Sequence, residues 1–381
     1  MKKVVLILLL LAVVVSATLS GCRSGDEKTI LTVYNWGEYI SRESDTISWR
    51  GREYEIKDVI AEFEAAYPQY KVNYQTYDDN EKMYAKLDTE SYDILVPSDY
   101  MVVRLIKEGR LLELDQSRLP NVKKYLDSRL ENLTYDSDQA LSDKVSSYAV
   151  PYMYCTVGLL YNQEEIAPIN TNDPAEAWDI LFDSAMDSRI GMYSSMRESI
   201  GVALNYYGHS LNTLDSGELD QAKNLLIDQR KNVRPLVGID ELKDKYVSGE
   251  LLAGVVWSGD HVVCQIRLEE AEEDPDKLQY VLPKGSNLSV DMLCVPKNAA
   301  NPDGAHDFIN FLYEPEIALI NAVYVGYSTP HTEALKGLPA EIINNLSYYP
   351  DDETMQSLEI YYSSEAIDST YDRIWQAILA N

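Results

Sequence analysis

The chain has 381 residues, 45% of them hydrophobic, and a formal net charge of −29 at pH 7. This length and hydrophobic content support two ordinary cores rather than one. Such a negative charge excludes nucleic acid as a partner. It suits either a cationic ligand or simple solubility, and charge alone does not distinguish these two. The 29 Tyr against 4 Phe suit a site that holds both apolar stems and ammonium groups, and equally fit a composition common to a whole lineage.

The N-terminal segment has the pattern of a secretory signal peptide. A short positive region precedes the apolar run 4–15, about a dozen residues, which is short for a membrane span and typical of a signal peptide. The motif Leu-Ser-Gly-Cys that ends at Cys22 resembles a bacterial lipobox. We expect removal of residues 1–21, lipid on Cys22, and a tether over residues 22–29 at the outer face of the cell membrane, which is periplasmic where an outer membrane exists. The alternative is an ordinary signal peptide followed by a chance cysteine.

Three further cysteines, Cys155, Cys264 and Cys294, lie among apolar neighbours. An odd number allows at most one internal disulfide. We favour buried, reduced thiols that pack as small hydrophobic groups. The cysteines lack metal-ligand spacing and the four histidines are scattered, so we expect neither a metal site nor a cofactor.

Beyond the tether, predicted strands alternate with predicted helices, as in parallel α/β layers. The first elements are a strand at 31–34, a helix with Val59, Ile60, Phe63 and Tyr67 on one face, strands at 70–74 and 92–96, and a helix from 97 to about 109. The alternation resumes over 150–259, then gives a strand at 292–296 and a helix at 305–312. Residues 41–53 are interpreted as an inserted loop, and the acidic stretches 136–143 and 269–276 as solvated surface.

A series of motifs, in chain order, resembles the spermidine/putrescine-binding proteins of bacterial polyamine ABC importers. The motifs are YNWGEY at 34–39, YDDNEKMYAKL at 77–87, YDILVPSDY at 92–100, VPY at 150–152, RE at 197–198, VWSGD at 256–260 and VGYSTP at 325–330. The resemblance covers about residues 30–380, and it is the family order of the motifs, rather than any one of them, that carries it.

The resemblance implies an α/β, two-lobed fold like that of type II periplasmic binding proteins, with the ligand in a cleft between the lobes. One lobe would comprise 28–149 with 290–315, and the other 150–289 with 316–381. It also implies a monomeric binding component, not an enzyme, that delivers a polyamine to transmembrane permease subunits served by a cytoplasmic ATPase.

A polyamine is a methylene chain that carries ammonium groups. Carboxylates neutralise the nitrogens, and aromatic faces cover the methylenes while attracting the cations. By resemblance, Glu198 and Asp291 bind amines and Trp257 stacks on the chain; Ser98 has the alternative of being only a helix N-cap. The full set implied as ligand-binding is Trp36, Tyr39, Ser98, Tyr100, Glu198, Trp257, Asp260, Asp291, Tyr327 and Tyr361.

Two positions depart from the family pattern. Ser195 stands where some relatives have a second Asp, and Ser289 where many have a large aromatic residue. The second change should weaken methylene packing by roughly 1–2 kcal/mol, and Asp260 is a candidate to replace the charge missing at Ser195. The preferred polyamine therefore stays open.

The sequence gives less support to an enzyme, to a structural lipoprotein or to a receptor for another ligand. Asp260 and His261 could be acid/base groups of a hydrolytic enzyme, but we expect them on a strand, where adjacent side chains point to opposite faces, and no nucleophile motif accompanies them. A structural lipoprotein is disfavoured by the absence of repeats. The closest alternative is a receptor for another organic cation or small metabolite.

Overall fold

The computed structural model describes residues 28–131 and 133–381. The predicted signal peptide, Cys22 and most of the predicted tether lie outside the described residues. Within the described part of the chain, no helix combines the length and the apolar character needed to cross a membrane.

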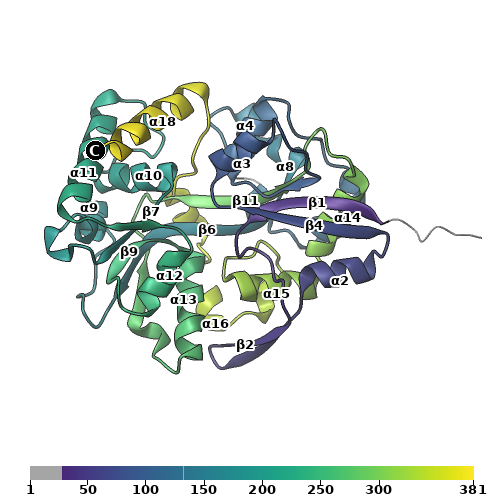
Figure 1. Ribbon diagram of the computed structural model, residues 1–381, viewed down its shortest axis with the longest axis horizontal. Coiled ribbons are helices and arrows are strands. Elements are labelled where there is room, and N and C mark those ends of the chain that lie inside the picture. Colours follow the sequence, from purple (N-terminus) through teal and green to yellow (C-terminus); the bar gives the residue numbers. More distant parts are fainter. Residues whose placement is uncertain (1–27, 132) are drawn as a thin grey trace, which may run out of the picture.

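One continuous sheet runs through the molecule in the strand order β4-β1-β5-β11-β6-β9-β7-β8, and β10 pairs with β6 (Figure 1). The strands are β1 (Thr29–Trp36), β4 (Tyr70–Tyr77), β5 (Ile94–Leu95), β6 (Ala149–Asn162), β7 (Ile190–Tyr193), β8 (Leu236–Gly238), β9 (Ala253–Trp257), β10 (Leu278–Val281) and β11 (Leu288–Cys294). At one end β1 is parallel to β4 and β5. At the other end β7 is parallel to β8 and β9.

Strands β6 and β11 belong to both ends of the sheet. β6 has 14 residues, all buried, and its first half pairs with β11 while its second half pairs with β9 and β10. β11 in turn reaches β5 at Cys294. The molecule therefore has two α/β lobes joined through two shared strands, which is the fold class predicted from the sequence.

Helices cover both faces of each lobe. In Figure 1, α3 and α4 lie on one side of the sheet and α2 and α15 on the other, while α10 and α18 face α12 and α13 across the second lobe. The longer helices are α2 (Val59–Ala66), α3 (Asn80–Lys86), α4 (Asp99–Lys107), α10 (Met196–Tyr206), α11 (Ser216–Asn232), α12 (Glu241–Val247), α13 (Ser258–Glu270), α14 (Pro302–Leu312), α15 (Pro315–Val325) and α18 (Glu365–Leu379). The shorter helices include α5 (Pro120–Tyr125), α7 (Gln139–Ser142), α9 (Pro174–Trp178) and α17 (Asp352–Ser357).

Helix α2 shows how the local sequence produces the fold. Asp58 caps it by accepting a hydrogen bond from the Ala61 N–H at 3.0 Å, which satisfies a backbone donor at the helix start. Val59, Ile60 and Phe63 form the buried face, as predicted, whereas Tyr67, predicted on the same face, is the C-cap residue and is only partly buried. This helix thus packs its apolar stripe on the first lobe.

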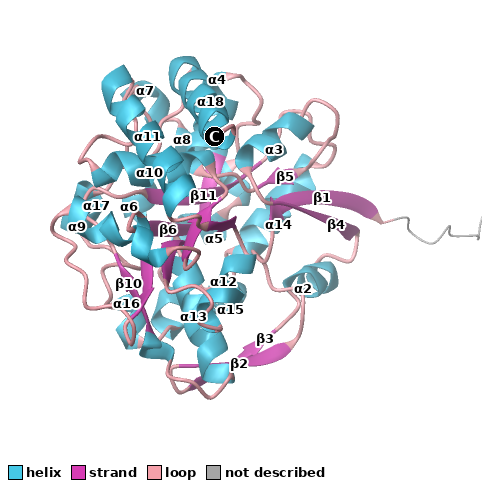
Figure 2. Cartoon of the chain, turned by 60° about the vertical axis from the view of Figure 1, so that its left-hand side comes forward, coloured by secondary structure: helices cyan, strands magenta, loops and turns pink. Residues whose placement is uncertain are grey.

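The region 41–53, interpreted as a loop, is a β-hairpin. β2 (Asp45–Trp49) pairs with β3 (Arg52–Ile56), and Figure 2 shows the hairpin apart from the main sheet. Arg50 and Gly51 at its tip both have positive φ, 50° and 70°, which a two-residue hairpin turn of this type requires. The loop interpretation was wrong for residues 45–53, because Gly51 allows the tight turn at the tip and tertiary contacts also hold it.

Most residues of the two acidic stretches are exposed, as predicted. Asp136 is an exception, because it is 3% exposed and lies 2.8 Å from Lys107. In the other stretch Arg50 lies 2.7 Å from Asp276, and its backbone N–H donates to Glu269 at 3.0 Å. Some of these carboxylates therefore also hold neighbouring elements.

Cys155, Cys264 and Cys294 are buried and free, as favoured from the sequence. Burial raises the pKa of the Cys264 thiol to about 12, so at neutral pH it stays protonated and packs as an apolar group.

Candidate functional site

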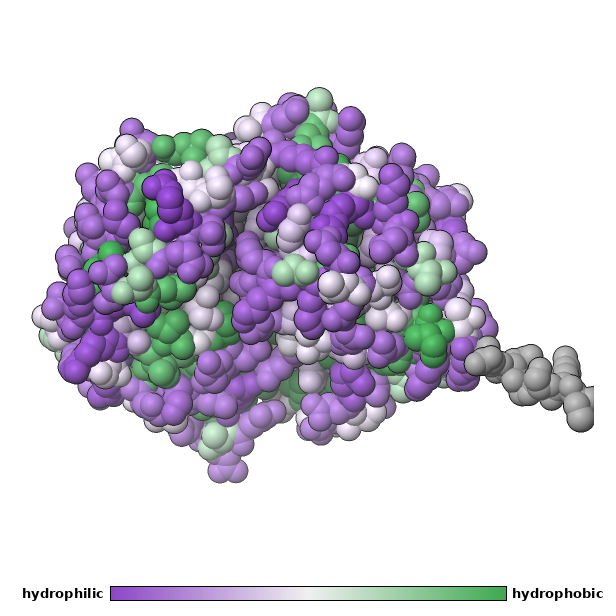
Figure 3. Space-filling view, turned by 45° about the horizontal axis from the view of Figure 1, so that its top comes forward, coloured by the Kyte–Doolittle hydropathy of each residue, from purple (hydrophilic) through white to green (hydrophobic). Residues whose placement is uncertain are grey.

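A cavity lies between the two lobes, where β1, β4 and β11 meet the N-terminal ends of α4, α10 and α13. It encloses about 700 Å³ of empty space, counting the part open to solvent. Figure 3 shows the surface hollowed between the lobes and covered there mainly by hydrophilic side chains. Of the predicted ligand residues, the cavity is lined by Trp36, Tyr39, Ser98, Tyr100, Glu198, Trp257, Asp291 and Tyr327.

Asp291 sits on the shared strand β11, at a register irregularity between Asp291 and Met292. Such irregularities re-aim side chains out of the regular pleat. The Tyr39 hydroxyl donates to one carboxylate oxygen at 2.6 Å, and the Ser98 hydroxyl donates to the other at 2.7 Å. Burial raises the pKa of Asp291 to about 6, and these two hydrogen bonds act against that rise. Among the described residues, Asp291 has only neutral hydroxyl partners and no ion pair.

Ser98 holds the N-cap position of α4, yet its side chain makes no capping bond. Its hydroxyl instead accepts from the Asn80 amide at 3.1 Å and donates to Asp291. Asn80 also accepts from the Ser98 N–H at 3.3 Å. The reading of Ser98 as only a cap is therefore wrong: its hydroxyl orients a buried carboxylate.

Glu198 lies in the first turn of α10 and lines the same cavity. The Ser195 hydroxyl donates to its carboxylate, and burial raises the pKa of Glu198 against that hydrogen bond. Its neighbour Arg197 points elsewhere, with the guanidinium 4.6 Å from the Tyr361 ring and 4.7 Å from the Tyr371 ring. The two residues of this motif thus have separate roles, one toward the cavity and one in the core.

Aromatic rings form opposite walls. Trp36 packs on Tyr77 with ring centroids 4.7 Å apart, and the Trp36 indole N–H donates to the Val96 carbonyl at 2.9 Å, which fixes the ring. In the second lobe Trp257 stacks on Tyr193 at 4.1 Å. Rings held in this way offer rigid π faces to a ligand.

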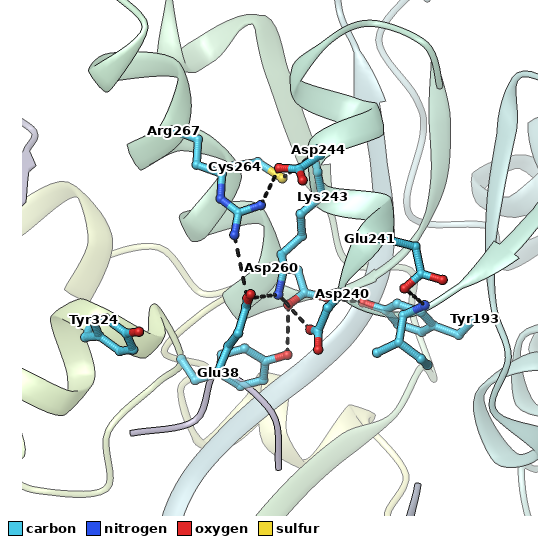
Figure 4. A network of polar contacts seen from close by, with 12 residues as sticks. Glu38, Tyr193, Asp240, Glu241, Lys243, Asp244, Asp260, Cys264, Arg267 and Tyr324 are labelled. Atoms are coloured by element: carbon cyan, nitrogen blue, oxygen red, sulfur yellow. Dashed lines mark hydrogen bonds and ion pairs between the residues drawn. The ribbon is translucent and has the colours of Figure 1, made fainter. Parts of the chain in front are cut away.

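Asp260 and Tyr361 do not line the cavity. Asp260 belongs to helix α13, not to a strand as expected, and it accepts from the hydroxyls of Tyr193 and Tyr327 behind the wall. Its other neighbour is Lys243, at 3.8 Å (Figure 4). Tyr361 packs against Arg197. Their direct contact with a ligand stays a prediction, and the geometry gives both a supporting position.

The cavity also contains residues to which sequence reasoning gave no ligand role. Ser195 and Ser289, the two departures from the family pattern, both line it. The others include Tyr77, Asp78, Asp79, Asn80, Cys155 and Asp240. A usable signal existed for the run from Tyr77, because it follows the carboxyl end of the parallel strand β4, where α/β proteins place their ligands.

Buried acidic groups give the site its electrostatic character. Burial raises the pKa of Asp99 to about 8 and that of Glu81 to about 7. Tyr100 donates to Glu81 at 3.0 Å, so this carboxyl adjoins the cavity wall. Within the described residues no cluster of His, Cys, Asp and Glu could hold a metal ion. A cation that enters the cavity would favour the ionised forms of these carboxyl groups.

Two α/β lobes that enclose a cavity across shared strands define a two-lobed binding protein for small molecules. The chain belongs to the bacterial extracellular solute-binding protein family, whose sequence model matches residues 58–346.

Individual relatives cover nearly the whole chain. The spermidine/putrescine-binding periplasmic protein of Escherichia coli (strain K12) is 30% identical over 359 residues, 93% of each chain. The solved spermidine/putrescine ABC transporter substrate-binding protein PotD of Streptococcus pneumoniae is 30% identical, with a TM-score of 0.70 over 93% of this chain and 99% of that one. The TpPotD lipoprotein of Treponema pallidum is 26% identical, with a TM-score of 0.71 over 92% and 99%.

Proposed function

We propose that this chain is the substrate-binding component of a polyamine ABC importer, which binds spermidine or putrescine between its lobes and delivers it to the permease. The observation that carries the proposal is Asp291, a carboxylate 7% exposed that faces the cavity with two hydroxyl donors and, among the described residues, no ion pair. A buried carboxylate of this kind gains strongly from a cationic partner.

The rest of the cavity fits the rest of a polyamine. Glu198 offers a second carboxylate from the other lobe. Trp36 and Trp257 present aromatic faces that cover methylenes and attract ammonium groups. The names of the relatives, which bind spermidine and putrescine, support the same ligand class.

Calorimetry with putrescine, spermidine, spermine and a neutral diol tests the proposal. We expect micromolar or tighter binding of at least one polyamine and none of the diol. A protein that binds no polyamine, or binds the diol as well, would contradict it. Selective binding of a different organic cation would keep the site and reject the ligand.

We propose that ligand closes the lobes and that the closed form docks on the permease without catalysing any reaction. The lobes would comprise residues 28–149 with 290–315 and 150–289 with 316–381, and strands β6 and β11 run between them. A ligand that touches both lobes favours closure through its extra contacts. Small-angle scattering should show compaction on adding ligand, and an unchanged profile at saturation would reject the closure.

Export and lipid anchoring at Cys22 complete the proposal. They rest on the apolar run 4–15 and the lipobox-like motif, and they are supported by the Treponema pallidum relative, which is a lipoprotein. Cys22→Ala should release or misprocess the protein. Mass spectrometry that finds an unlipidated mature N-terminus in the wild type would reject the anchor.

A further inference from the structure

Lys243 of α12 places an ammonium group beside the ligand cavity. Its side chain is 5% exposed. Its Nζ lies 2.8 Å from Asp240, 3.0 Å from Glu38 and 3.8 Å from Asp260. Figure 4 shows these carboxylates arranged around the lysine nitrogen. Burial acts to lower the pKa of Lys243, but the three carboxylates raise it above its usual value, so the group is cationic at neutral pH.

The position of this ammonium group relative to the cavity is informative. Gly37, Tyr39, Asp240 and Tyr327 line the cavity and also line a second one behind it. Lys243 lines only the second. The two spaces therefore adjoin at these four residues, and Lys243 lies on the far side of that shared wall.

The surroundings of Lys243 match those expected for a ligand amine. Asp260 accepts from two tyrosine hydroxyls, just as Asp291 accepts from Tyr39 and Ser98. In the proposed function, the cation that pairs with Asp291 is an ammonium group of the ligand. The cation beside Asp260 is Lys243, which belongs to the chain itself. A lysine side chain is four methylenes ending in an ammonium group, which is the chemistry of one polyamine segment.

The carboxylates come from both lobes. Glu38 follows β1 in the first lobe, while Asp240 and Asp260 belong to the α12 and α13 region of the second. The backbone of Glu38 has φ 49°, a left-handed conformation that a residue other than glycine keeps only where its surroundings favour it. This geometry directs Glu38 toward Lys243 and Arg267.

We propose that Lys243 is a built-in ammonium group that occupies an amine subsite at one end of the cleft and so limits the length of the polyamine accepted. The inference rests on the proposed function and adds a determinant of selectivity to it. Removing the lysine side chain should open the subsite, with its carboxylates, to the next amine of a longer ligand.

Calorimetry with putrescine, spermidine and spermine tests this in Lys243→Ala, Lys243→Met and the matched control Lys245→Ala, whose exposed lysine lies on the same helix and pairs with Glu250. Lys243→Ala should shift the preference toward spermine by about tenfold or more. Lys243→Met, whose unbranched stem fills the space, and Lys245→Ala should keep the wild-type preference. A Lys243→Ala preference within about twofold of the wild type overturns the proposal.

A second readout separates this inference from the function on which it rests. Propylammonium, which supplies the three carbons and the ammonium group that Lys243→Ala lacks, should raise the thermal stability of Lys243→Ala and leave the wild type unchanged. If the wild type binds no polyamine but the added amine still stabilises Lys243→Ala, the proposed polyamine function is rejected and the ammonium subsite is kept. If the added amine does not stabilise Lys243→Ala, the subsite is rejected. If Lys243→Ala fails to fold, the double variant with Asp260→Asn retains the two nearest carboxylates, Asp240 and Glu38, and the same outcomes decide.

Discussion

Two buried aspartates, Asp291 and Asp260, have similar surroundings and opposite consequences. Each is nearly inaccessible, at 7% and 3% exposure, and each accepts hydrogen bonds from two side-chain hydroxyls. Asp260 also has Lys243 at 3.8 Å, whereas Asp291 has no ion pair among the described residues. The charge of Asp260 is therefore used within the protein, whereas that of Asp291 has no cationic partner among the described residues, as the proposed amine site requires.

The contrast between the two aspartates predicts that the largest loss of polyamine affinity comes from a substitution at Asp291. Asp291→Asn should weaken polyamine binding by about 2–4 kcal/mol, because a largely desolvated ammonium loses its partner. Glu198→Gln should act in the same direction through the second carboxylate. Calorimetry on folded variants measures both, and wild-type affinity in both would remove the assigned site.

Asp291→Asn should weaken ligand binding but increase the stability of the ligand-free protein. The pKa of Asp291 is raised to about 6, above its value of about 4 in the unfolded chain. Folding therefore favours the protonated form, and this contribution to stability is full below pH ~4 and is lost as the pH rises through ~6.

Asp291→Asn should thus stabilise the ligand-free protein by roughly 1–3 kcal/mol at pH 7 and little at pH 4. Thermal unfolding at the two pH values, with Glu270→Gln as an exposed control, provides the measurement. Equal effects at both pH values would show that burial does not penalise this carboxylate.

The aromatic wall should contribute less than the carboxylate. Trp257→Ala removes one face of the cavity and the stack on Tyr193, so polyamine affinity should fall by about 1–2 kcal/mol. Trp257→Phe should recover part of it. A loss limited to thermal stability, with affinity unchanged, would assign Trp257 to the core instead.

The smallest effect on affinity is expected at Asp260. Asp260→Asn should cost less than about 1 kcal/mol in polyamine binding, because Lys243 and two hydroxyls already use its charge. The surface control Glu270→Gln should change nothing measurable. A loss as large as that of Asp291→Asn would show that both aspartates contact the ligand and would end the contrast between them.

Sequence patterns predicted several of the elements, and the family resemblance predicted eight of the residues that line the cavity. The apolar face of α2 and the buried strand that ends before Ser98 follow from local periodicity. The pairing of Ser98 with Asp291 joins residues 193 positions apart, which no local pattern encodes, so only the resemblance brought them into one site.

The region around Asp260 could not be predicted in this way. Lys243 and Lys245 lie two positions apart in the same polar segment, yet their side chains are 5% and 39% exposed. The difference depends on which face of α12 packs against α13, a tertiary property. The hairpin tip at Arg50 has the same origin, because its partners Glu269 and Asp276 are more than two hundred residues away.

The central claim, that Asp291 is an unneutralised carboxylate reserved for a ligand amine, is tested most directly by proton release. Spermidine calorimetry at pH 6, compared between buffers of different ionisation enthalpy, counts the protons lost on binding. Since the pKa of Asp291 is raised to about 6 in the ligand-free protein and an ammonium partner lowers it, the wild type should release protons and Asp291→Asn should release fewer. Equal proton release from the two proteins, or equal affinity, would contradict the account.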